Sequence, residues 1–277
     1  MGTKTYMDYS PEATALVKQA CLQITTYLQD FMEEDIVIVG GLVPTLIVDL
    51  AALPTDTERH SGTMDIDLGF SLALLGNPER YHRLADRLRK SGFAPDKNEK
   101  GNPSPQRWCY KDTSLTIDFL ISGTGIEGGK VAHIEDDFAA IEIPGLSLAF
   151  ESPLSVLLED ETLEGELARR TVKVCNPGAY VVLKALAFRN RGNDKDAYDL
   201  YYVVRNFNDT ERSVTDYFNQ LPETVEKAVA LTILSEDFAS EGHLGPKRIA
   251  RFLGDPNNDE ILADATGFIQ GFIKGCN

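Results

Sequence analysis

The chain has 277 residues, of which 43% are hydrophobic and 25% are charged, and its formal net charge is −16. A chain of this length and composition can bury a sizeable core, in one large domain or two small ones. The acidic balance argues against broad, non-specific binding of nucleic acid, because such binding depends on Lys and Arg that neutralise phosphates.

Membrane insertion and secretion are not expected. No apolar run has the length of a membrane span, and residues 1–10 lack the apolar core of a signal peptide. Four cysteines are scattered along the chain without metal-binding spacing. We therefore expect a cytoplasmic protein with reduced thiols and no membrane partner.

The first half of the chain predicts alternating helices and strands. Apolar residues at helical spacing predict a helix over 11–31. A short apolar strand over 35–40 ends at Gly40-Gly41, and an apolar segment predicts a second helix over 42–52. The next expected elements are a loop over 54–63, a strand over 64–70, a helix over 78–91, and a hairpin of strands over 106–111 and 115–121.

The second half changes character at Asn176-Pro177-Gly178, a break in the pattern. Before it we expect strands over 130–134, 140–148 and 171–174, with a helix over 153–167. After it we expect only helices, over 179–190, 194–205, 211–219, 223–234 and 259–273. The order predicts an α/β (α+β) fold, with a mixed sheet flanked by helices in residues 1–175 and a helical C-terminal domain in residues 176–277.

Three aspartates are the main candidates for catalysis. Side chains alternate along a strand, so Asp65 and Asp67 point to one face. Asp118 lies in a second predicted strand and would bring a third carboxylate there, which leaves the apolar Ile117 and Phe119 on the opposite, buried face. Carboxylates that converge repel one another and normally need a cation, and hard oxygen ligands suit Mg²⁺ or Mn²⁺. The sequence therefore predicts a divalent metal site at these aspartates.

The glycine pair Gly40-Gly41 stands where a predicted strand turns into a predicted helix. Glycine lets the backbone approach a phosphate closely, and the N–H groups at a helix N-terminus bind anions. We therefore expect Gly40 and Gly41 to bind a nucleotide's phosphates beside the metal site. Two metal ions there could activate a hydroxyl and stabilise a leaving pyrophosphate.

The order of Gly-Gly, Asp-x-Asp and a later Asp resembles the nucleotidyltransferase superfamily with the DNA polymerase β-like core. Residues 59–68, RHSGTMDIDL, look most like its AbiEii branch, the nucleotidyltransferase-like toxins of bacterial abortive-infection and toxin–antitoxin systems. A second block is similar to that branch: residues 180–187 with Lys184, then Arg189, then residues 195–201, KDAYDLY. The resemblance covers residues 36–204.

The resemblance implies a metal-dependent nucleotidyltransferase that moves a nucleotide from a nucleoside triphosphate to an acceptor hydroxyl on tRNA or protein. It also implies a toxin with a cognate antitoxin protein as partner, and Mg²⁺ or Mn²⁺ as cofactor. The implied catalytic residues are Asp65, Asp67, Asp118 and Lys184; the implied nucleotide-binding residues are Gly40, Gly41, Lys184 and Asp196; the implied metal ligands are Asp65, Asp67 and Asp118.

Several side chains near these motifs keep two interpretations. Lys184 either binds phosphate or extends along a partly buried helix. Asp196 either orients Lys184 or acts on the substrate, and Asp199 is expected to be structural, paired either with Arg189 or with a helix N-terminus. Arg107 either binds triphosphate or forms a surface ion pair. His60 is expected only to cap its loop.

A basic patch is expected from cations that are close together in sequence, and it would suit an anionic substrate. They are Arg169, Arg170, Lys173, Lys184, Arg189, Arg191 and Lys195.

Three alternative functions stay open. One is a nucleotidyltransferase that modifies a small molecule such as an antibiotic. Another is a non-catalytic module that binds a nucleotide or a partner protein. The third is a dinucleotide-binding site, because residues 123–128 match Gly-x-Gly-x-x-Gly; that motif needs a helix immediately afterwards, and we expect a loop instead.

Overall fold

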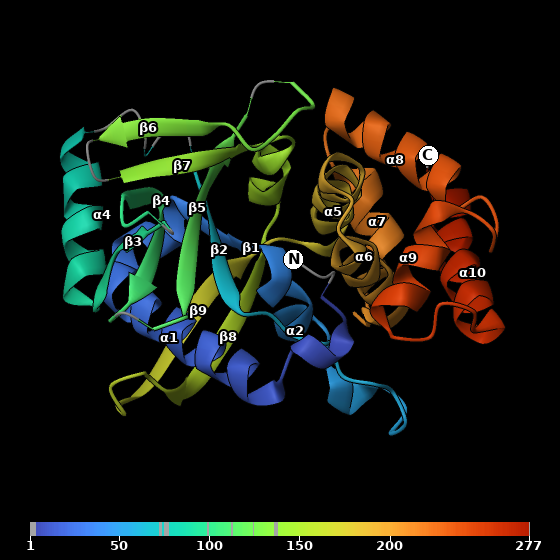
Figure 1. Cartoon of the computed structure of the whole chain (residues 1–277), viewed down its shortest axis with the longest axis horizontal. Coiled ribbons are helices and arrows are strands. Elements are labelled where there is room, and N and C mark those ends of the chain that lie inside the picture. Colours follow the sequence, from blue (N-terminus) through green and yellow to red (C-terminus); the bar gives the residue numbers. More distant parts are fainter. Residues whose placement is uncertain are drawn as a thin grey trace. The chain divides into compact units, whose positions relative to one another are not determined.

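The computed structural model describes residues 4–71, 74, 78–98, 100–111, 113–123, 125–135 and 138–276. Contacts between Cα atoms divide the chain into two compact units. We call Pro11–Val43 with Gly62–Cys175 the sheet unit, and the segment up to Ser10 with Pro44–Ser61 and the segment from Asn176 the helical unit. The two predicted domains, 1–175 and 176–277, share with these units the division after Cys175. The predicted fold class, a mixed α/β sheet with helices at the C-terminus, is confirmed (Figure 1).

The described residues of the sheet unit form one mixed sheet in the order β3-β4-β5-β2-β1-β9-β8, and β7 joins it by pairing with β5 and β6. Strands β2 and β5 run parallel in its middle, whereas β4 pairs antiparallel with β5 and β1 antiparallel with β2. The strands are β1 (Ile36–Val39), β2 (Asp65–Phe70), β3 (Phe93–Lys97), β4 (Pro103–Tyr110), β5 (Thr116–Ser122), β6 (Val131–Glu135), β7 (Phe138–Ile143), β8 (Leu154–Glu161) and β9 (Leu167–Val174).

One face of the central strands is apolar and fully buried. Ile66 on β2 pairs with Ile117 on β5, and neither is exposed. On the same face the ring of Phe119 stacks on Phe138 at 4.5 Å between ring centroids, and Trp108 meets both rings edge-on. Burial of each such aromatic side chain contributes roughly 1.5–3 kcal/mol. This core fixes β2 and β5 side by side, and with them the opposite, polar face.

Two helices accompany the sheet. The long α1 (Pro11–Glu34) contacts β1, β2, β8 and β9, and it also contacts α4 (Pro78–Lys90) (Figure 1). Helix α1 buries an apolar stripe that includes Val17, Ile24 and Leu28, as the helical spacing predicts. A short 3-10 helix, η4 (Leu146–Phe150), contacts β1 and β5.

Two predicted helices are wrong. Residues 153–167 form strand β8, a turn and the start of β9, because Leu154, Val156 and Leu158 alternate and pair across the hairpin with Val174, Val172 and Arg170. The predicted helix over 42–52 shrinks to α2 (Val43–Ile47). Asp49 ends it by capping a separate 3-10 helix, η3 (Leu50–Ala52), with a side-chain oxygen that accepts from the Ala51 N–H.

The dinucleotide-binding alternative is contradicted by the segment after the glycines. Strand β6 begins at Val131, so no helix follows the motif. Thr124, within the motif, lies outside the described residues. Gly128 instead packs against the next hairpin, since a Cβ there would lie 2.7 Å from Pro144 Cδ. The predicted loop is therefore what the described residues form.

The helical unit is built from helices that pack around the largely buried α5, and most of them begin with a side-chain cap. Helix α5 starts with the Asn176 side chain accepting from the Ala179 N–H and ends at Gly192, which has a left-handed φ of 62°. Gly178 lets α5 approach α7 closely, because a Cβ there would lie 2.4 Å from the Phe218 backbone nitrogen. The helices are α5 (Pro177–Arg191), α6 (Asp194–Asn206), α7 (Val214–Gln220), α8 (Val225–Asp237), α9 (Leu244–Phe252) and α10 (Asp259–Gly275), and a 3-10 helix, η1, covers Tyr6–Asp8. None of the helices described is long and apolar enough to cross a bilayer.

Candidate functional site

Asp65, Asp67 and Asp118 lie on one face of the sheet. In the parallel register of β2 and β5, Asp67 pairs with Asp118 and Asp65 pairs with Thr116. Because paired residues share a face, the three carboxylates stand on the face opposite the aromatic core. Thr63 Oγ1 donates a 2.8 Å hydrogen bond to Asp65 Oδ1 and so orients that carboxylate. The shared face is the one that side-chain alternation predicts.

Gly40 is fitted to this face at the end of β1. Its φ is +69°, in the left-handed region that favours glycine. A Cβ at this position would lie 1.8 Å from Asp67 Oδ2, so the backbone of Gly40 lies directly against that carboxylate. The glycine therefore gives space to Asp67.

The predicted helix after the glycines is too short to act as an anion-binding dipole. Gly40–Leu42 is a 3-10 helix, η2, and α2 after it has only five residues. The macrodipole of a longer helix is thus absent from this turn, and any phosphate contact at Gly40 and Gly41 would rest on backbone amides alone.

Arg107 forms an ion pair with the third carboxylate, that of Asp118. It is the cross-strand partner of Asp118, and its Nε and Nη2 donate to the two Asp118 oxygens at 2.6 and 2.5 Å. Asp118 is buried, whereas 43% of the Arg107 side chain is exposed. Its hydrogen bond to Asp118 raises the pKa of Arg107 against the effect of burial, and the charges of Asp118, Asp65 and Asp67 add to that rise. The guanidinium is therefore the internal countercharge of all three carboxylates.

Two of the three aspartates could together bind a divalent cation. Asp65 and Asp67 are both partly exposed and offer hard oxygens on one face, and Asp67 lies against the Gly40 backbone. In the described parts of the chain, no three His, Cys, Asp or Glu side chains are gathered into a group that would hold a metal ion. Both Asp118 oxygens accept from Arg107, so a cation that shared Asp118 would lie close to that guanidinium.

Lys184 lies in a second charged cluster, inside the helical unit. It is buried on α5, and its Nζ donates to Asp196 Oδ1 at 3.0 Å and to Asp199 Oδ2 at 2.7 Å. Burial alone would lower the pKa of Lys184, but Asp199 and Asp196 outweigh it and raise that pKa. Asp196 also accepts two hydrogen bonds from Arg191, at 2.6 and 2.7 Å. Both predicted binding residues of this block are thus already paired with charged side chains.

Asp199 is the centre of that cluster. Besides Lys184 it accepts from Lys195 Nζ at 2.6 Å, and its Oδ1 lies 2.9 Å from His60 Nε2. Burial opposes ionisation of Asp199, but Lys184, Lys195 and His60 hold its pKa well below the ordinary value. Burial lowers the pKa of His60 to about 4, so the ring is neutral at neutral pH and donates from Nε2.

Two expectations about this cluster are therefore wrong. His60 does not merely cap its loop: it is buried, bonds Asp199, and stacks on Tyr198 at 5.3 Å between ring centroids. Asp199 does not pair with Arg189, which instead contacts Glu236 and Asp237. Asp199 lies one helical turn from Lys195 and faces α5, so its ion-pair partners are Lys195 and Lys184.

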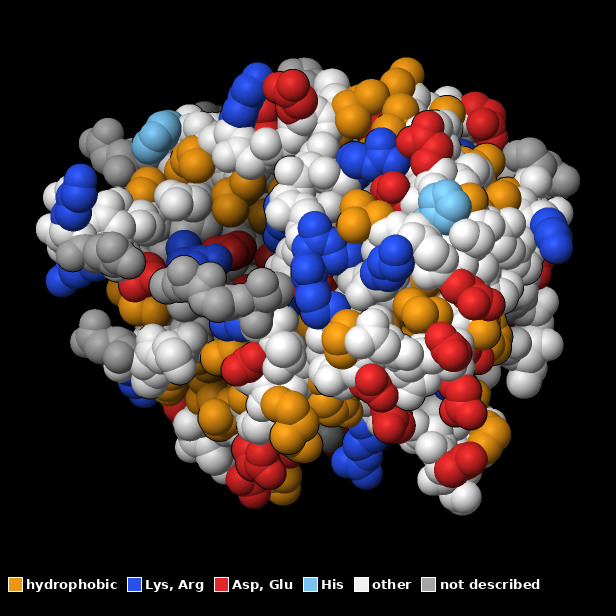
Figure 2. All heavy atoms as spheres, turned by 45° about the vertical axis from the view of Figure 1, so that its right-hand side comes forward, with side chains coloured by type: hydrophobic (Ala, Val, Ile, Leu, Met, Phe, Trp, Pro, Cys, Tyr) orange, Lys and Arg blue, Asp and Glu red, His pale blue; other side chains and the backbone are white. Residues whose placement is uncertain are grey.

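The expected basic patch is neutralised where it falls in the helical unit. All four of its cations there form ion pairs with acidic side chains. They are Lys184, Arg189, Arg191 and Lys195. On the face shown in Figure 2, acidic side chains gather over the C-terminal helices, in keeping with the net charge of −16.

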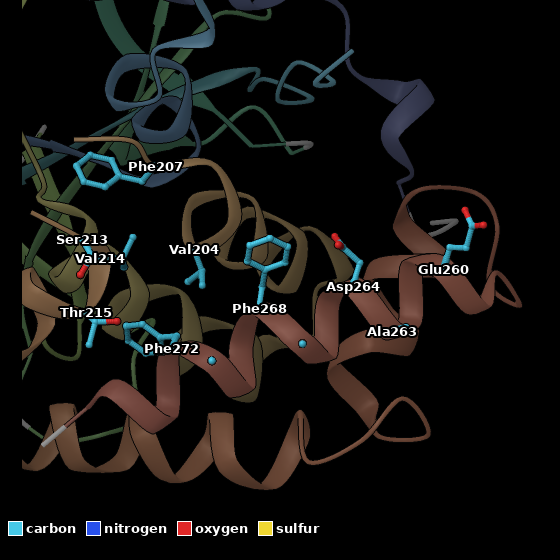
Figure 3. A pocket seen from close by; sticks show the side chains of 12 residues that line it. Val204, Phe207, Ser213, Val214, Thr215, Glu260, Ala263, Asp264, Phe268 and Phe272 are labelled. Carbon is cyan, nitrogen blue, oxygen red and sulfur yellow. The ribbon is translucent and has the colours of Figure 1, made fainter. Parts of the chain in front are cut away.

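A separate hollow of about 780 Å³ lies within the helical unit, between α6, α7 and α10. Val204, Phe268 and Phe272 contribute its apolar lining (Figure 3). None of the predicted site residues lines it. The hollow is therefore not part of the predicted carboxylate site.

Sequence reasoning missed Thr63, which gave no signal beyond its closeness to Asp65. Of the two interpretations of Arg107, the ion pair is the one that the structure contains, with Asp118 as the partner. The hairpin explains it, because it places a fork-shaped cation opposite a carboxylate on one face. Comparison of the chain with models of known protein families found no match, and comparison with curated proteins found no relative.

Proposed function

We propose that this chain is a divalent-metal-dependent nucleotidyltransferase, which moves a nucleotide from a nucleoside triphosphate to an acceptor hydroxyl. The observation that carries the proposal is the pairing of Asp67 with Asp118 in register, with Asp65 on the same face and the Gly40 backbone against Asp67. Arg107 brings one positive charge to three carboxylates, so a further cation beside Asp65 and Asp67 would offset the remaining negative charge. Two carboxylates beside a glycine turn suit a cation that carries a triphosphate.

Asp65 and Asp67 would hold Mg²⁺ or Mn²⁺, which when bound supplies charge stabilisation for the displaced pyrophosphate. Thr63 fixes the orientation of Asp65 through its 2.8 Å hydrogen bond. Gly40 has no side chain where the Asp67 carboxylate lies, and the amides of Gly40 and Gly41 are the candidate phosphate donors. Asp118 and Arg107 complete the charged face and are bonded to each other.

The ion pairs of Lys184 and Asp196 limit what these two residues can do in the proposed reaction. Lys184 would bring a positive charge to the pyrophosphate, as the resemblance implies, only by giving up contacts with two buried carboxylates. Asp196 acts first on Lys184 and Arg191, which supports an orienting role over direct action on the substrate.

Calorimetry tests the proposal at the level of binding. Each nucleoside triphosphate is titrated into the protein with Mg²⁺ and with a chelator, and one of them should bind only with Mg²⁺. The variant Asp65→Asn with Asp67→Asn should lose that binding and keep its unfolding transition. A matched control is Asp160→Asn with Glu161→Gln, on the exposed end of β8 in the same sheet. Metal-dependent binding that survives in the Asp65, Asp67 variant would contradict the proposal.

The acceptor follows from the same proposal at a finer level. By resemblance the acceptor is tRNA or protein and the chain is a toxin with an antitoxin partner. The net charge of −16 favours a small or protein acceptor over a large RNA, since RNA would be repelled by most of the surface. Transfer of labelled nucleotide to bulk tRNA, to cell protein or to an aminoglycoside separates these acceptors.

A further inference from the structure

We infer that Arg107 is an exchangeable countercation: it pairs with Asp118, leaves that carboxylate when a divalent cation binds, and then contacts the triphosphate. This inference rests on the proposed function and adds a residue and a sequence of events to it. The proposed metal ligands Asp65 and Asp67 need no arginine, so the two ideas can fail separately.

The first support is the position of the guanidinium. Arg107 on β4 and Asp67 on β2 are the two cross-strand neighbours of Asp118, so cation and carboxylates line one row across three strands. The fork of Arg107 covers both oxygens of Asp118. A divalent ion shared by Asp67 and Asp118 would lie beside that guanidinium, and like charges at such a separation repel strongly because the carboxylate is buried. Cation binding and the Arg107–Asp118 pair are therefore competing states.

The second support is the exposure of Arg107. The Arg107 side chain is 43% exposed while Asp118 is covered, so the guanidinium has room to move on the solvent side. The guanidinium can thus swing away without breaking the core, which lies on the opposite face. Arginine binds phosphate through the same two-pronged geometry with which it holds a carboxylate, so a triphosphate beside the metal is a ready second partner.

If Arg107 and the cation compete for Asp118, removing Arg107 must increase the affinity for Mn²⁺. If Arg107 holds Asp118 in about nine of ten molecules, the measured Mn²⁺ dissociation constant is about tenfold weaker than that of the open site. Removing the arginine should therefore tighten Mn²⁺ binding about tenfold. A residue that merely orients Asp118 for the metal would give the opposite sign, because its loss would disorder a ligand.

The test measures free Mn²⁺ by electron paramagnetic resonance in titrations of the whole chain. Arg107→Gln should bind Mn²⁺ about tenfold more tightly than the parent protein. The matched control is Arg169→Gln, which removes a cross-strand arginine from an exposed pair with Glu159 in the same sheet and should leave Mn²⁺ binding unchanged. Asp118→Asn serves as a second background: there, Arg107→Gln should change Mn²⁺ binding little, because the site of competition is gone.

The second half of the inference is tested with inorganic tripolyphosphate in the presence of Mn²⁺. Arg107→Gln should weaken tripolyphosphate binding by at least about tenfold, since it loses a charge-assisted contact. In the parent protein, the Arg107 Nε–H resonance should shift on addition of Mg²⁺ while that of Arg169 should not. This last measurement needs no variant, so it decides the matter even if Arg107→Gln fails to fold.

The outcomes separate cleanly. A parent protein that binds no Mn²⁺ overturns the metal site and this inference together. A parent that binds Mn²⁺ while Arg107→Gln binds it equally or more weakly overturns the exchange alone. If Arg107→Gln tightens Mn²⁺ binding equally in the parent and in Asp118→Asn, Arg107 is only a distant charge. An unmoved Arg107 resonance would also contradict the exchange.

Discussion

Replacing Gly40 with alanine should damage the carboxylate face more than it damages the backbone. The φ of +69° costs a residue with a Cβ about 1–2 kcal/mol. The new Cβ would also lie 1.8 Å from Asp67 Oδ2 and 2.5 Å from its Cγ, against an ordinary contact of 3.4–4 Å. Asp67 must therefore rotate away, and overpacking of this kind costs about 1–3 kcal/mol more.

Gly165 supplies a matched control in the turn between β8 and β9. Its φ is +79°, but a Cβ at this position would have nothing within 4 Å, so Gly165→Ala should lose only the backbone part, about 1–2 kcal/mol. Urea unfolding measures both losses. Mn²⁺ titration measures the consequence: Gly40→Ala should bind the ion about 10–100-fold more weakly, and Gly165→Ala should match the parent. Equal stability loss and equal Mn²⁺ affinity in the two variants would refute the reasoning.

Two further predictions concern the buried cluster of the helical unit. Asp199→Asn should lower the free energy of unfolding by about 3–5 kcal/mol, because buried Lys195 loses its carboxylate partner. The control is Glu236→Gln, in an exposed pair with Arg189, which should lower it by less than about 1 kcal/mol. Similar losses in the two variants would contradict this explanation. His60 has an ordinary pKa of 6.5 when unfolded and about 4 when folded, so the unfolded chain takes up a proton first as the pH falls. The contribution of His60 to the free energy of unfolding should therefore be constant above pH 6.5 and fall by about 3 kcal/mol between pH 6.5 and 4. In urea unfolding, His60→Gln should lack that part of the fall. An identical pH dependence in variant and parent would show that His60 is not buried in its neutral form.

The central strands could be predicted because their apolar faces are continuous and their polar faces carry a distinct motif. Strand β2 alternates Ile66, Leu68 and Phe70 with Asp65 and Asp67, so period and face agree. The edge elements could not be predicted in the same way. Strand β3 contains Pro95, which opposes a strand locally, so pairing with β4 is what supports it.

The charged residues show the same limit. Alternation sufficed to predict one face for the three aspartates, since a strand has only two faces, but the register that pairs Asp118 with Asp67 comes from the structure. It could not show that Lys184 would be enclosed with Asp196 and Asp199, because the partner of a buried lysine depends on how two helices pack. In β8, Leu and Glu residues favour a helix locally, and the hairpin with β9 overrides that preference.

The central claim is tested most directly by nucleotide transfer itself. The chain is incubated with each labelled nucleoside triphosphate, Mg²⁺, and total cell RNA or protein, and the products are separated on a gel. The account predicts label on an acceptor with one nucleotide, dependent on Mg²⁺ and absent in Asp65→Asn with Asp67→Asn. Label that persists in this double variant, or no transfer to any acceptor by a parent protein that binds Mg²⁺ and triphosphate, would contradict it.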